Sequence, residues 1–188
     1  MSHLEYHVSM KALRYISVVR SGGQTGADRG ALDAARVMGV PVCGWCPEGG
    51  WAEDALEPPG LLAWYPELIE APSPDPIVRT EWNVRDSDAT LIVCPGEMSN
   101  CSGTAATLEF AKRYGKPYFV SNGSDFEEVR AWAESLVCAN GAPKLQEGRP
   151  TSADGLDLNV AGPRESGSPG VYELTKDLVV RLLHIEDD

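Results

Sequence analysis

Residues 14–29 read Arg-Tyr-Ile-Ser-Val-Val-Arg-Ser-Gly-Gly-Gln-Thr-Gly-Ala-Asp-Arg, an apolar segment followed by a glycine-rich turn and the start of a periodic segment. The part from Arg14 to Val19 is rich in β-branched and aromatic residues, which is typical of a buried strand. The residues that recur at helical spacing after the turn are Ala27, Ala31, Ala34, Ala35 and Met38. This stretch therefore predicts a strand, a tight turn and a helix, the repeating unit of α/β proteins.

The same unit recurs along the chain. Predicted strands cover 14–19, 42–45, 89–94, 117–120 and 156–161, and predicted helices cover 27–38, 77–86, 104–114, 126–136 and 171–185. Residues 89–94 are uniformly apolar, as expected of the central strand of a parallel sheet. Asp75 and Pro76 are suited to cap and begin a helix. Alternating strands and helices imply right-handed crossovers, so we expect an α/β, Rossmann-like fold with an open, mainly parallel sheet and helices on both faces.

The length of 188 residues predicts a single domain over 1–188. Within it we expect a flexible tail at 1–13, a long functional loop rich in Gly and Pro at 46–76, and a surface excursion at 139–155. An apolar fraction of 43% with 23% charged residues indicates a globular chain rather than a disordered one.

Charge and apolar patterning exclude several classes of partner. There are 28 acidic and 16 basic residues, and the resulting formal net charge of −12 disfavours nucleic acid, whose phosphates are bound by Lys and Arg. The apolar run Leu61 to Tyr65 is far shorter than the roughly 20 residues of a spanning helix, so no membrane partner is expected. Residues 1–14 contain no apolar stretch of signal-peptide length. Five cysteines in such a chain favour a reducing, cytoplasmic location.

The three histidines, His3, His7 and His184, all lie near an end of the chain. Chain ends are usually poorly ordered, so a Ser-His-Asp triad, a Cys-His pair or a His-rich zinc site is not expected.

Three predicted strand-to-helix turns have unusual composition: Ser21 to Arg29, Ser99 to Thr104, and Gly162 to Ser166. In a parallel sheet such turns share the carboxyl edge, where ligands bind. Glycines let the backbone approach an anion, and free N–H groups at a helix start favour negative charge. Each turn alone is also compatible with tight geometry only. Together they predict a site for a phosphate or similar anion.

Arg79 and Asn83 are four residues apart and share one face of the predicted helix 77–86. Arg79 could bind a phosphate, and Asn83 a ribose, base or pterin edge. The alternative is a surface arginine and a helix-capping asparagine. Asp28 lies in the first helical turn, where a carboxylate is stabilised by the helix dipole, so a structural role is equally open for it.

Common catalytic and cofactor motifs are not matched. The turn Gly22 to Gly26 is neither the dinucleotide fingerprint GxGxxG nor a nucleoside-triphosphate P-loop. No carboxylate pair stands out as acid and base, although candidate carboxylates near the predicted site are Asp28, Asp54, Asp86, Asp88 and Glu109. Cys43 and Cys46 could form a redox pair, or a zinc site with Cys94 and Cys101; packed, inert thiols are the alternative.

Five blocks resemble, in order, the family of molybdenum carrier proteins: Ser21 to Arg29, Gly44 to Pro47, Ala52 to Asp54, Arg79 to Asp88, and Leu158 to Ser166. The resemblance spans about residues 21–182. It implies a Rossmann-like fold, usually oligomeric, related to the lysine-decarboxylase-like phosphoribohydrolases. It also implies binding and protection of molybdenum cofactor (molybdopterin), a phosphorylated pterin whose dithiolene holds the metal.

Two departures from the family pattern affect the expected chemistry. The usual Gly-Gly-Thr is Ser102-Gly103-Thr104 here, which adds a hydroxyl. The phosphoribohydrolase relatives carry a catalytic glutamate at the position of Thr107, and Glu109 lies about 200° further around the helix. The resemblance therefore implies binding rather than hydrolysis.

The sequence thus predicts non-catalytic carriage of molybdenum cofactor or a related phosphorylated pterin or nucleotide, with no catalytic residue and no metal ligand from the protein. The alternatives are a nucleotide-processing enzyme, either an N-glycosidase or a phosphohydrolase, and a thiol module. We expect a homo-oligomer, dimer or tetramer, from the resemblance and from the run Leu61 to Tyr65, with molybdoenzymes as recipients. The predicted binding residues are Ser21, Gly22, Gly23, Gln24, Thr25, Gly26, Asp28, Arg79, Asn83, Ser102, Gly103, Thr104 and Arg164.

Overall fold

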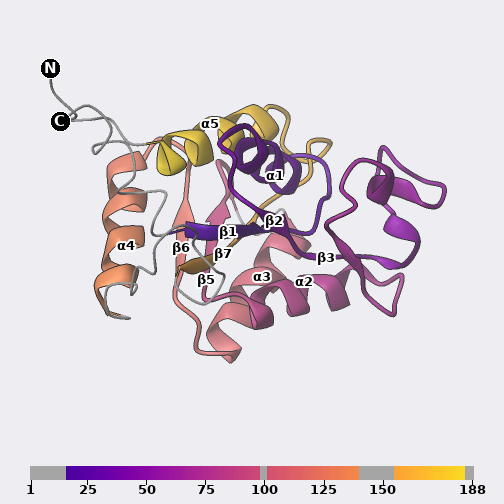
Figure 1. Ribbon diagram of the computed structural model, residues 1–188, viewed down its shortest axis with the longest axis horizontal. Coiled ribbons are helices and arrows are strands. Elements are labelled where there is room, and N and C mark those ends of the chain that lie inside the picture. The colour runs from indigo at the N-terminus through magenta and orange to yellow at the C-terminus, as the bar shows by residue number, and fades with distance from the viewer. Residues whose placement is uncertain (1–15, 98–100, 140–154, 185–188) are drawn as a thin grey trace, which may run out of the picture.

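A five-stranded sheet in the order β2-β1-β7-β5-β6 forms the centre of the protein (Figure 1). The computed structural model describes residues 16–97, 101–139 and 155–184. The strands of this sheet are β1 (Ile16–Arg20), β2 (Val42–Cys43), β5 (Ala89–Val93), β6 (Tyr118–Ser121) and β7 (Leu156–Ala161). Within the described ranges every pairing between them is parallel.

Helices cover both faces of the sheet. They are α1 (Ala27–Val37), α2 (Pro76–Asp86), α3 (Ser102–Arg113), α4 (Phe126–Ala139) and α5 (Val171–Leu183). Helices α1 and α5 pack together on one face, α2 and α3 pack together on the other, and α4 lies beside β6 (Figure 1). The predicted α/β, Rossmann-like architecture is confirmed.

The centre of the sheet differs from the prediction. The central strand is β7, which pairs with β1 and with β5, whereas β5 lies between β7 and the edge strand β6. All five residues of β5 are nevertheless buried, because strands flank it on both sides and helices cover its faces. Apolar composition therefore identified an interior strand correctly but not its position in the order.

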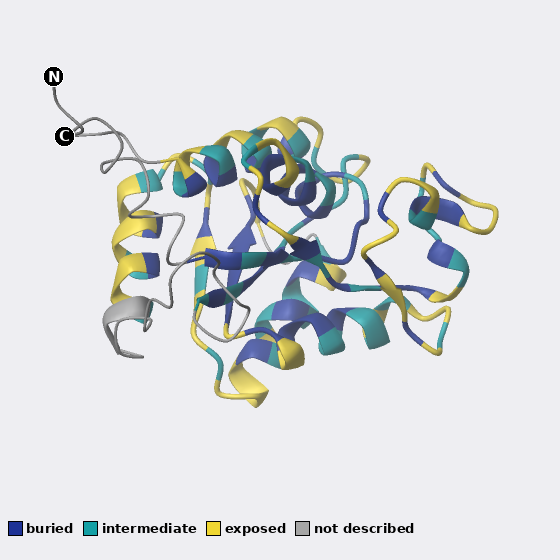
Figure 2. Cartoon of the chain, viewed as in Figure 1, coloured by how far each residue is buried: buried dark blue, intermediate teal, exposed yellow. Residues whose placement is uncertain are grey.

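The small residues of α1 allow a close helix contact. The predicted core alanines Ala27, Ala31, Ala34 and Ala35 are all fully buried. At Gly30, a Cβ atom would lie 2.4 Å from the backbone oxygen of Tyr172 on α5, so only glycine permits this approach. Figure 2 shows the buried residues gathered on the sheet and on the inward faces of the helices.

The predicted strand 42–45 is divided between two sheets. Residues 42–43 form β2, whereas β3 (Trp45–Cys46) leaves the main sheet and pairs with β4 (Ile69–Glu70). The break occurs at Gly44, which has φ 144° and whose added Cβ would lie 2.0 Å from the Ser21 backbone oxygen. Two short 3₁₀ helices, η1 (Glu48–Gly50) and η2 (Gly60–Ala63), follow β3 in the segment at the right of Figure 1.

The apolar run 61–65 is buried at its two ends and more exposed between them. Leu61 is fully buried and Tyr65 is 4% exposed, while Trp64 is 48% exposed. The run therefore contributes to the core, and only its tryptophan offers a large apolar surface.

The predicted helix start at residue 75 is confirmed, since Asp75 Oδ1 accepts a hydrogen bond of 2.9 Å from the Ile77 N–H and Pro76 occupies the first turn. Several other predictions lie outside the described residues: the tail 1–13, the strand residues 14–15, most of the excursion 139–155, and Ser99 and Asn100. None of the helices in the described ranges combines the length and apolar character that crossing a bilayer requires.

Candidate functional site

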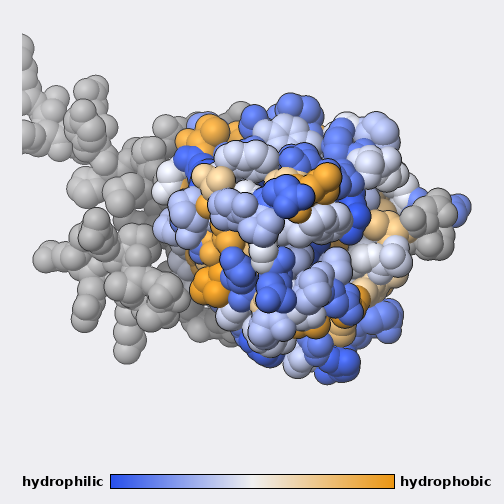
Figure 3. All heavy atoms as spheres, turned by 90° about the vertical axis from the view of Figure 1, so that its right-hand side faces the viewer, coloured by the Kyte–Doolittle hydropathy of each residue, from blue (hydrophilic) through white to orange (hydrophobic). Residues whose placement is uncertain are grey.

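A cavity of about 500 Å³ lies at the carboxyl edge of the sheet. Its walls come from the first turn, the starts of α2 and α3, and the end of β7 with the following loop. They comprise Gln24, Asp28, Asp75, Pro76, Ile77, Arg79, Thr80, Cys101, Ser102, Gly103, Thr107, Ala161, Gly162, Arg164, Ser166 and Gly167. All three turns singled out in the sequence thus border one hollow, joined by the start of α2. The side of the molecule that carries residues 45–70 is mainly hydrophilic, with small hydrophobic patches (Figure 3).

The cavity gathers part of the predicted binding set. The predicted binding residues that line the cavity are Gln24, Asp28, Arg79, Ser102, Gly103 and Arg164. The predicted binding residues outside the lining are Ser21, Gly22, Gly23, Thr25, Gly26, Asn83 and Thr104.

Arg79 and Asp28 form a buried ion pair at the cavity wall. Arg79 Nη1 lies 2.8 Å from Asp28 Oδ2, and the two side chains are 13% and 3% exposed. Gly22 makes room for the guanidinium, since a Cβ at that position would lie 1.7 Å from Arg79 Nη1. In the described part of the chain, the buried Arg79 Nε has no hydrogen-bond acceptor. Arg79 therefore has a buried N–H donor that the described residues leave unused.

The remaining residues of the first turn are held by the protein itself. Ser21 donates a 2.7 Å hydrogen bond to the Val160 carbonyl. Gly26, with φ 78°, lies so close to the next loop that a Cβ would be 2.5 Å from the Pro163 oxygen, which also accepts from the Ala27 N–H. These contacts join the first and third turns, so these residues shape the cavity wall without lining it.

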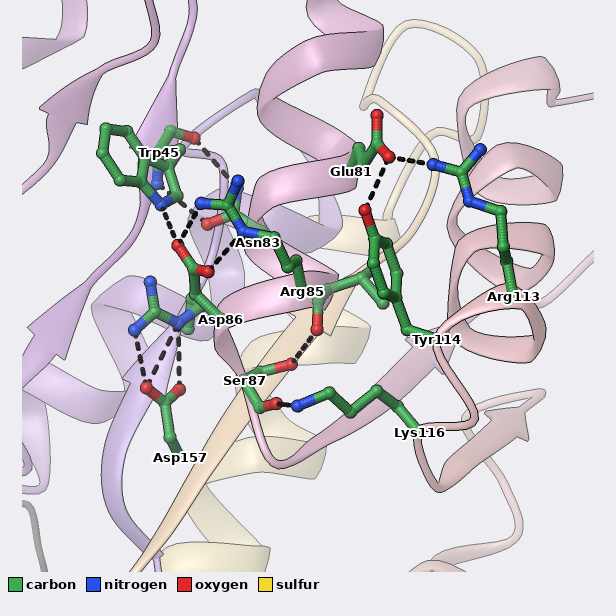
Figure 4. Close-up of polar contacts among 12 residues, drawn as sticks. Trp45, Glu81, Asn83, Arg85, Asp86, Ser87, Arg113, Tyr114, Lys116 and Asp157 are labelled. Carbon is green, nitrogen blue, oxygen red and sulfur yellow. Dashed lines mark hydrogen bonds and ion pairs between the residues drawn. The ribbon is translucent and has the colours of Figure 1, made fainter.

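Asn83 is engaged with the backbone of β3 and lies outside the cavity lining. Its Oδ1 accepts from the Trp45 N–H at 2.8 Å, and its Nδ2 donates to the Trp45 carbonyl at 2.9 Å. The Trp45 indole N–H donates to Asp86, which also pairs with Arg85 (Figure 4). The hydrogen bond from Arg85 outweighs burial and lowers the pKa of Asp86. Asn83 thus anchors the strand that leaves the main sheet.

The start of α3 is open toward the cavity. Ser102 and Gly103 are exposed, and a Cβ on Gly103 would meet no atom within 4 Å. Thr104 is buried and donates to the Cys101 sulfur at 2.9 Å. Thr107 lines the cavity and donates to the Gly103 carbonyl. The prediction that Glu109 points elsewhere is confirmed, because its side chain is 71% exposed and pairs with Lys112.

The third turn joins the cavity to the 45–70 segment. The Arg164 guanidinium carbon lies 5.2 Å from the centre of the Trp51 ring, a cation–π contact. Ser166 Oγ donates to Glu53 at 2.6 Å, and Thr25 donates to the same carboxylate. Burial acts to raise the pKa of Glu53, but these hydrogen bonds and the nearby Arg164 leave it below its ordinary value.

Two comparisons place the chain among known proteins. A solved structure of a "Putative molybdenum carrier protein" from Syntrophus aciditrophicus SB is 35% identical, with a TM-score of 0.70, over 89% of this chain and 96% of that one. The circularly permutated YpsA SLOG family matches residues 19–183. The chain belongs to this family. The resemblance seen in the sequence is confirmed. No curated protein matches the chain.

In this member of the YpsA SLOG family, sequence reasoning missed several residues of the cavity wall. Gly162 and Ser166 belong to the third of the unusual turns, whereas the sequence indicates only a helix start for Asp75 and Pro76. For Thr107, the family pattern indicates only that it stands in place of a glutamate. For Ile77, Thr80, Cys101, Ala161 and Gly167, no signal in the sequence indicates a position beside the others.

The cysteines of this family member favour packed thiols over redox chemistry. Burial raises the pKa of Cys43 and of Cys46 to about 11, so both are protonated at neutral pH. Cys46 is fully buried, and its sulfur lies 3.5 Å from the Ile69 carbonyl. Within the described ranges, no group of His, Cys, Asp and Glu could hold a metal ion, so the alternative of a zinc site gains no support.

Proposed function

We propose that this chain binds molybdenum cofactor, or a related phosphorylated pterin or nucleotide, and carries it without chemical conversion. One observation carries the proposal: three strand-to-helix turns and the start of α2 border a single cavity whose wall contains two guanidinium groups, Arg79 and Arg164. The name given to the solved relative, "Putative molybdenum carrier protein", supports the choice of cargo.

The cavity offers donors suited to a phosphate. Arg79 has a buried Nε without an acceptor among the described residues, which fits an oxyanion brought by the ligand. The open start of α3 adds the Ser102 hydroxyl and the backbone N–H groups of a helix N-terminus. A volume of about 500 Å³ is within the usual range for small-ligand pockets. In molybdenum cofactor, the cargo's own dithiolene would hold the metal.

The carboxylates near the cavity support carriage over turnover. Asp28 is paired with Arg79, and Asp75 caps α2. Thr107 stands where the related phosphoribohydrolases carry their catalytic glutamate. Of the other candidates for a phosphohydrolase, Asp54 pairs with Arg29, and Asp88 accepts from the Asp157 N–H at 2.8 Å. Each of these carboxylates already has a structural partner.

The test is protection of the cofactor in air. Molybdenum cofactor is mixed with the protein, and the fraction still able to activate an apo-molybdoenzyme is followed over time. We expect the wild type to prolong the lifetime, and Arg164→Met to weaken binding about tenfold, as expected for one charged hydrogen bond. Arg36→Met is the matched control, because Arg36 pairs with Glu67 away from the cavity.

Equal cofactor lifetimes with and without the protein would reject carriage. Release of free base or inorganic phosphate from nucleoside monophosphates would instead favour the nucleotide-processing alternative. The same preparation tests the proposed homo-oligomer, dimer or tetramer, by light scattering, and the proposed transfer to molybdoenzymes by the activation assay.

A further inference from the structure

A second cavity, of about 420 Å³, lies within the segment that joins β3 to α2. Its walls are apolar except for one carboxylate, and the side chains used below are Glu48, Trp51, Leu56, Pro58, Pro74 and Pro76. An indole, an aliphatic side chain and three proline rings provide flat apolar surface, which suits a planar ring.

The second cavity adjoins the first. Pro76 lines both of them. Arg164, in the wall of the first cavity, lies 5.2 Å from the ring centre of Trp51, in the wall of the second. A ligand whose anionic group contacts Arg164 would therefore have its neighbouring atoms beside Trp51.

The segment that forms the second cavity is held open by its own backbone. Gly50 and Gly60 cross so closely that a Cβ on Gly60 would lie 2.1 Å from the Gly50 oxygen. Glu53 ties the segment to the first turn, since its N–H donates to Gln24 Oε1 at 2.9 Å and its carboxylate accepts from Thr25. The cavity is thus formed before any ligand binds, which lowers the entropic cost of binding.

Leu56 is left uncovered at this cavity. Its side chain is 65% exposed although it borders a hollow, so an apolar partner placed there would remove this surface from water. The aromatic face of a heterocycle meets this requirement, and stacking on an indole adds to it.

Glu48 gives the cavity a chemical preference. Glu48 is exposed and is the one charged residue among the residues that line this cavity. A carboxylate accepts two parallel N–H donors, and the amino-lactam edge of a pterin or a guanine presents such a pair. The corresponding edge of adenine presents one donor beside one acceptor, which a carboxylate matches less well.

We infer that the second cavity is the subsite for the planar ring of the ligand and that Glu48 selects rings with an amino-lactam edge. This inference rests on the proposed function, because the phosphate of the same ligand occupies the first cavity. It narrows the ligand class to phosphorylated pterins and guanine-type compounds.

Calorimetric titration of the full chain with GMP, AMP and inorganic phosphate tests the inference. We expect GMP to bind at least about tenfold more tightly than AMP or phosphate. Glu48→Gln should remove the preference for GMP over AMP and leave phosphate binding unchanged. Glu57→Gln is the matched control, because Glu57 is exposed in the same segment and lines neither cavity.

Two further variants test the ring surface. Leu56→Asp places a charge in the second cavity at an exposed position, so folding is preserved; it should weaken GMP binding at least about tenfold and leave phosphate binding unchanged. Val37→Asp, at a position 71% exposed on α1, is its control. Trp51→Ala should behave as Leu56→Asp does, and Trp64→Ala as the wild type.

Each outcome decides between the two proposals. If inorganic phosphate binds and GMP binds no more tightly than phosphate, the ring subsite is overturned and the proposed function still stands. Equal affinity for GMP and AMP overturns the role of Glu48. If Trp51→Ala weakens the binding of inorganic phosphate as much as the binding of GMP, the indole acts only through Arg164 and the ring subsite is overturned. No binding of any of the three compounds overturns the ring subsite, and the cofactor-lifetime assay then decides the proposed function separately.

Discussion

The ion pair between Arg79 and Asp28 gives the sharpest test of how the cavity wall is held together. Arg79 Nη1 lies 2.8 Å from Asp28 Oδ2, with only 13% and 3% of the side chains exposed. Arg79→Met removes the cation, keeps most of the apolar volume and leaves the Asp28 carboxylate buried without its partner. Asp28→Asn removes the anion at nearly constant size and leaves the guanidinium unpaired at the edge of the cavity.

The expected magnitudes follow from burial. Two unit charges 2.8 Å apart attract each other by about 6 kcal/mol at an effective dielectric constant of about 20, and desolvation of both groups offsets much of this. Breaking a buried pair by removing one partner costs about 3–5 kcal/mol. Arg79→Met should therefore lower the melting temperature by about 6–20 °C in a chain of this length. Asp28→Asn should cost about 2 kcal/mol, since Arg79 borders the cavity and is more accessible to water than Asp28.

The assay is a double-mutant cycle. Urea denaturation followed by tryptophan fluorescence gives the free energy of unfolding of the wild type, both single variants and the double variant. The double variant should be about 2 kcal/mol more stable than Arg79→Met, because it contains no buried unpaired charge. Titration with inorganic phosphate should show tighter binding in Asp28→Asn, where Arg79 is no longer neutralised, and weaker binding in Arg79→Met. A loss below about 1 kcal/mol in Arg79→Met, or strictly additive effects, would refute the reasoning.

Three further predictions concern residues outside the cavity lining. Asn83→Ala should lower the free energy of unfolding by about 2–3 kcal/mol, because both backbone groups of Trp45 lose a buried partner, while calorimetry should show unchanged phosphate affinity. Glu53→Gln should destabilise the protein at about pH 7, and this loss should become smaller as the pH falls below 4.5. The pKa of Glu53 is below its ordinary 4.5, so the stabilisation by its carboxylate is complete above that value and is lost as the pH falls through the lowered pKa. Urea denaturation over a series of pH values from about 7 downward checks this. Cys43 and Cys46 should react slowly with a thiol reagent at neutral pH, since burial raises the pKa of each to about 11, and a rate equal to that of the urea-unfolded chain would contradict this.

The helices and strands with strong local signals were predicted well. The alanine face of α1 is buried as its spacing indicates, and Asp75 caps α2. These features depend on residues within one or two helical turns of each other, so the sequence contains the information directly. The helical angle between Thr107 and Glu109 was also sufficient to predict that the Glu109 side chain points elsewhere.

Prediction was weaker where an element's position depends on a distant segment. Arg79 and Asn83 share a helix face but lie one helical turn apart. Arg79 lines the cavity, whereas Asn83 is hydrogen-bonded to the backbone of β3. The bend at Gly44, which carries β3 out of the main sheet, depends on close contact with Ser21. Spacing within a single helix contains no information on which neighbour each turn meets.

The amino-acid sequence by itself determined the α/β class, the alternation of strands and helices, the glycine turns and the family, because propensity, capping and apolar period act over short distances. Only the tertiary structure decided that β7 lies at the centre of the sheet, that Arg79 pairs with Asp28 across 51 residues, and that two cavities meet at Pro76. These features arise when separate elements pack, and many strand orders satisfy the same local preferences. The choice among them depends on the packing of whole surfaces, which no short stretch of the chain specifies.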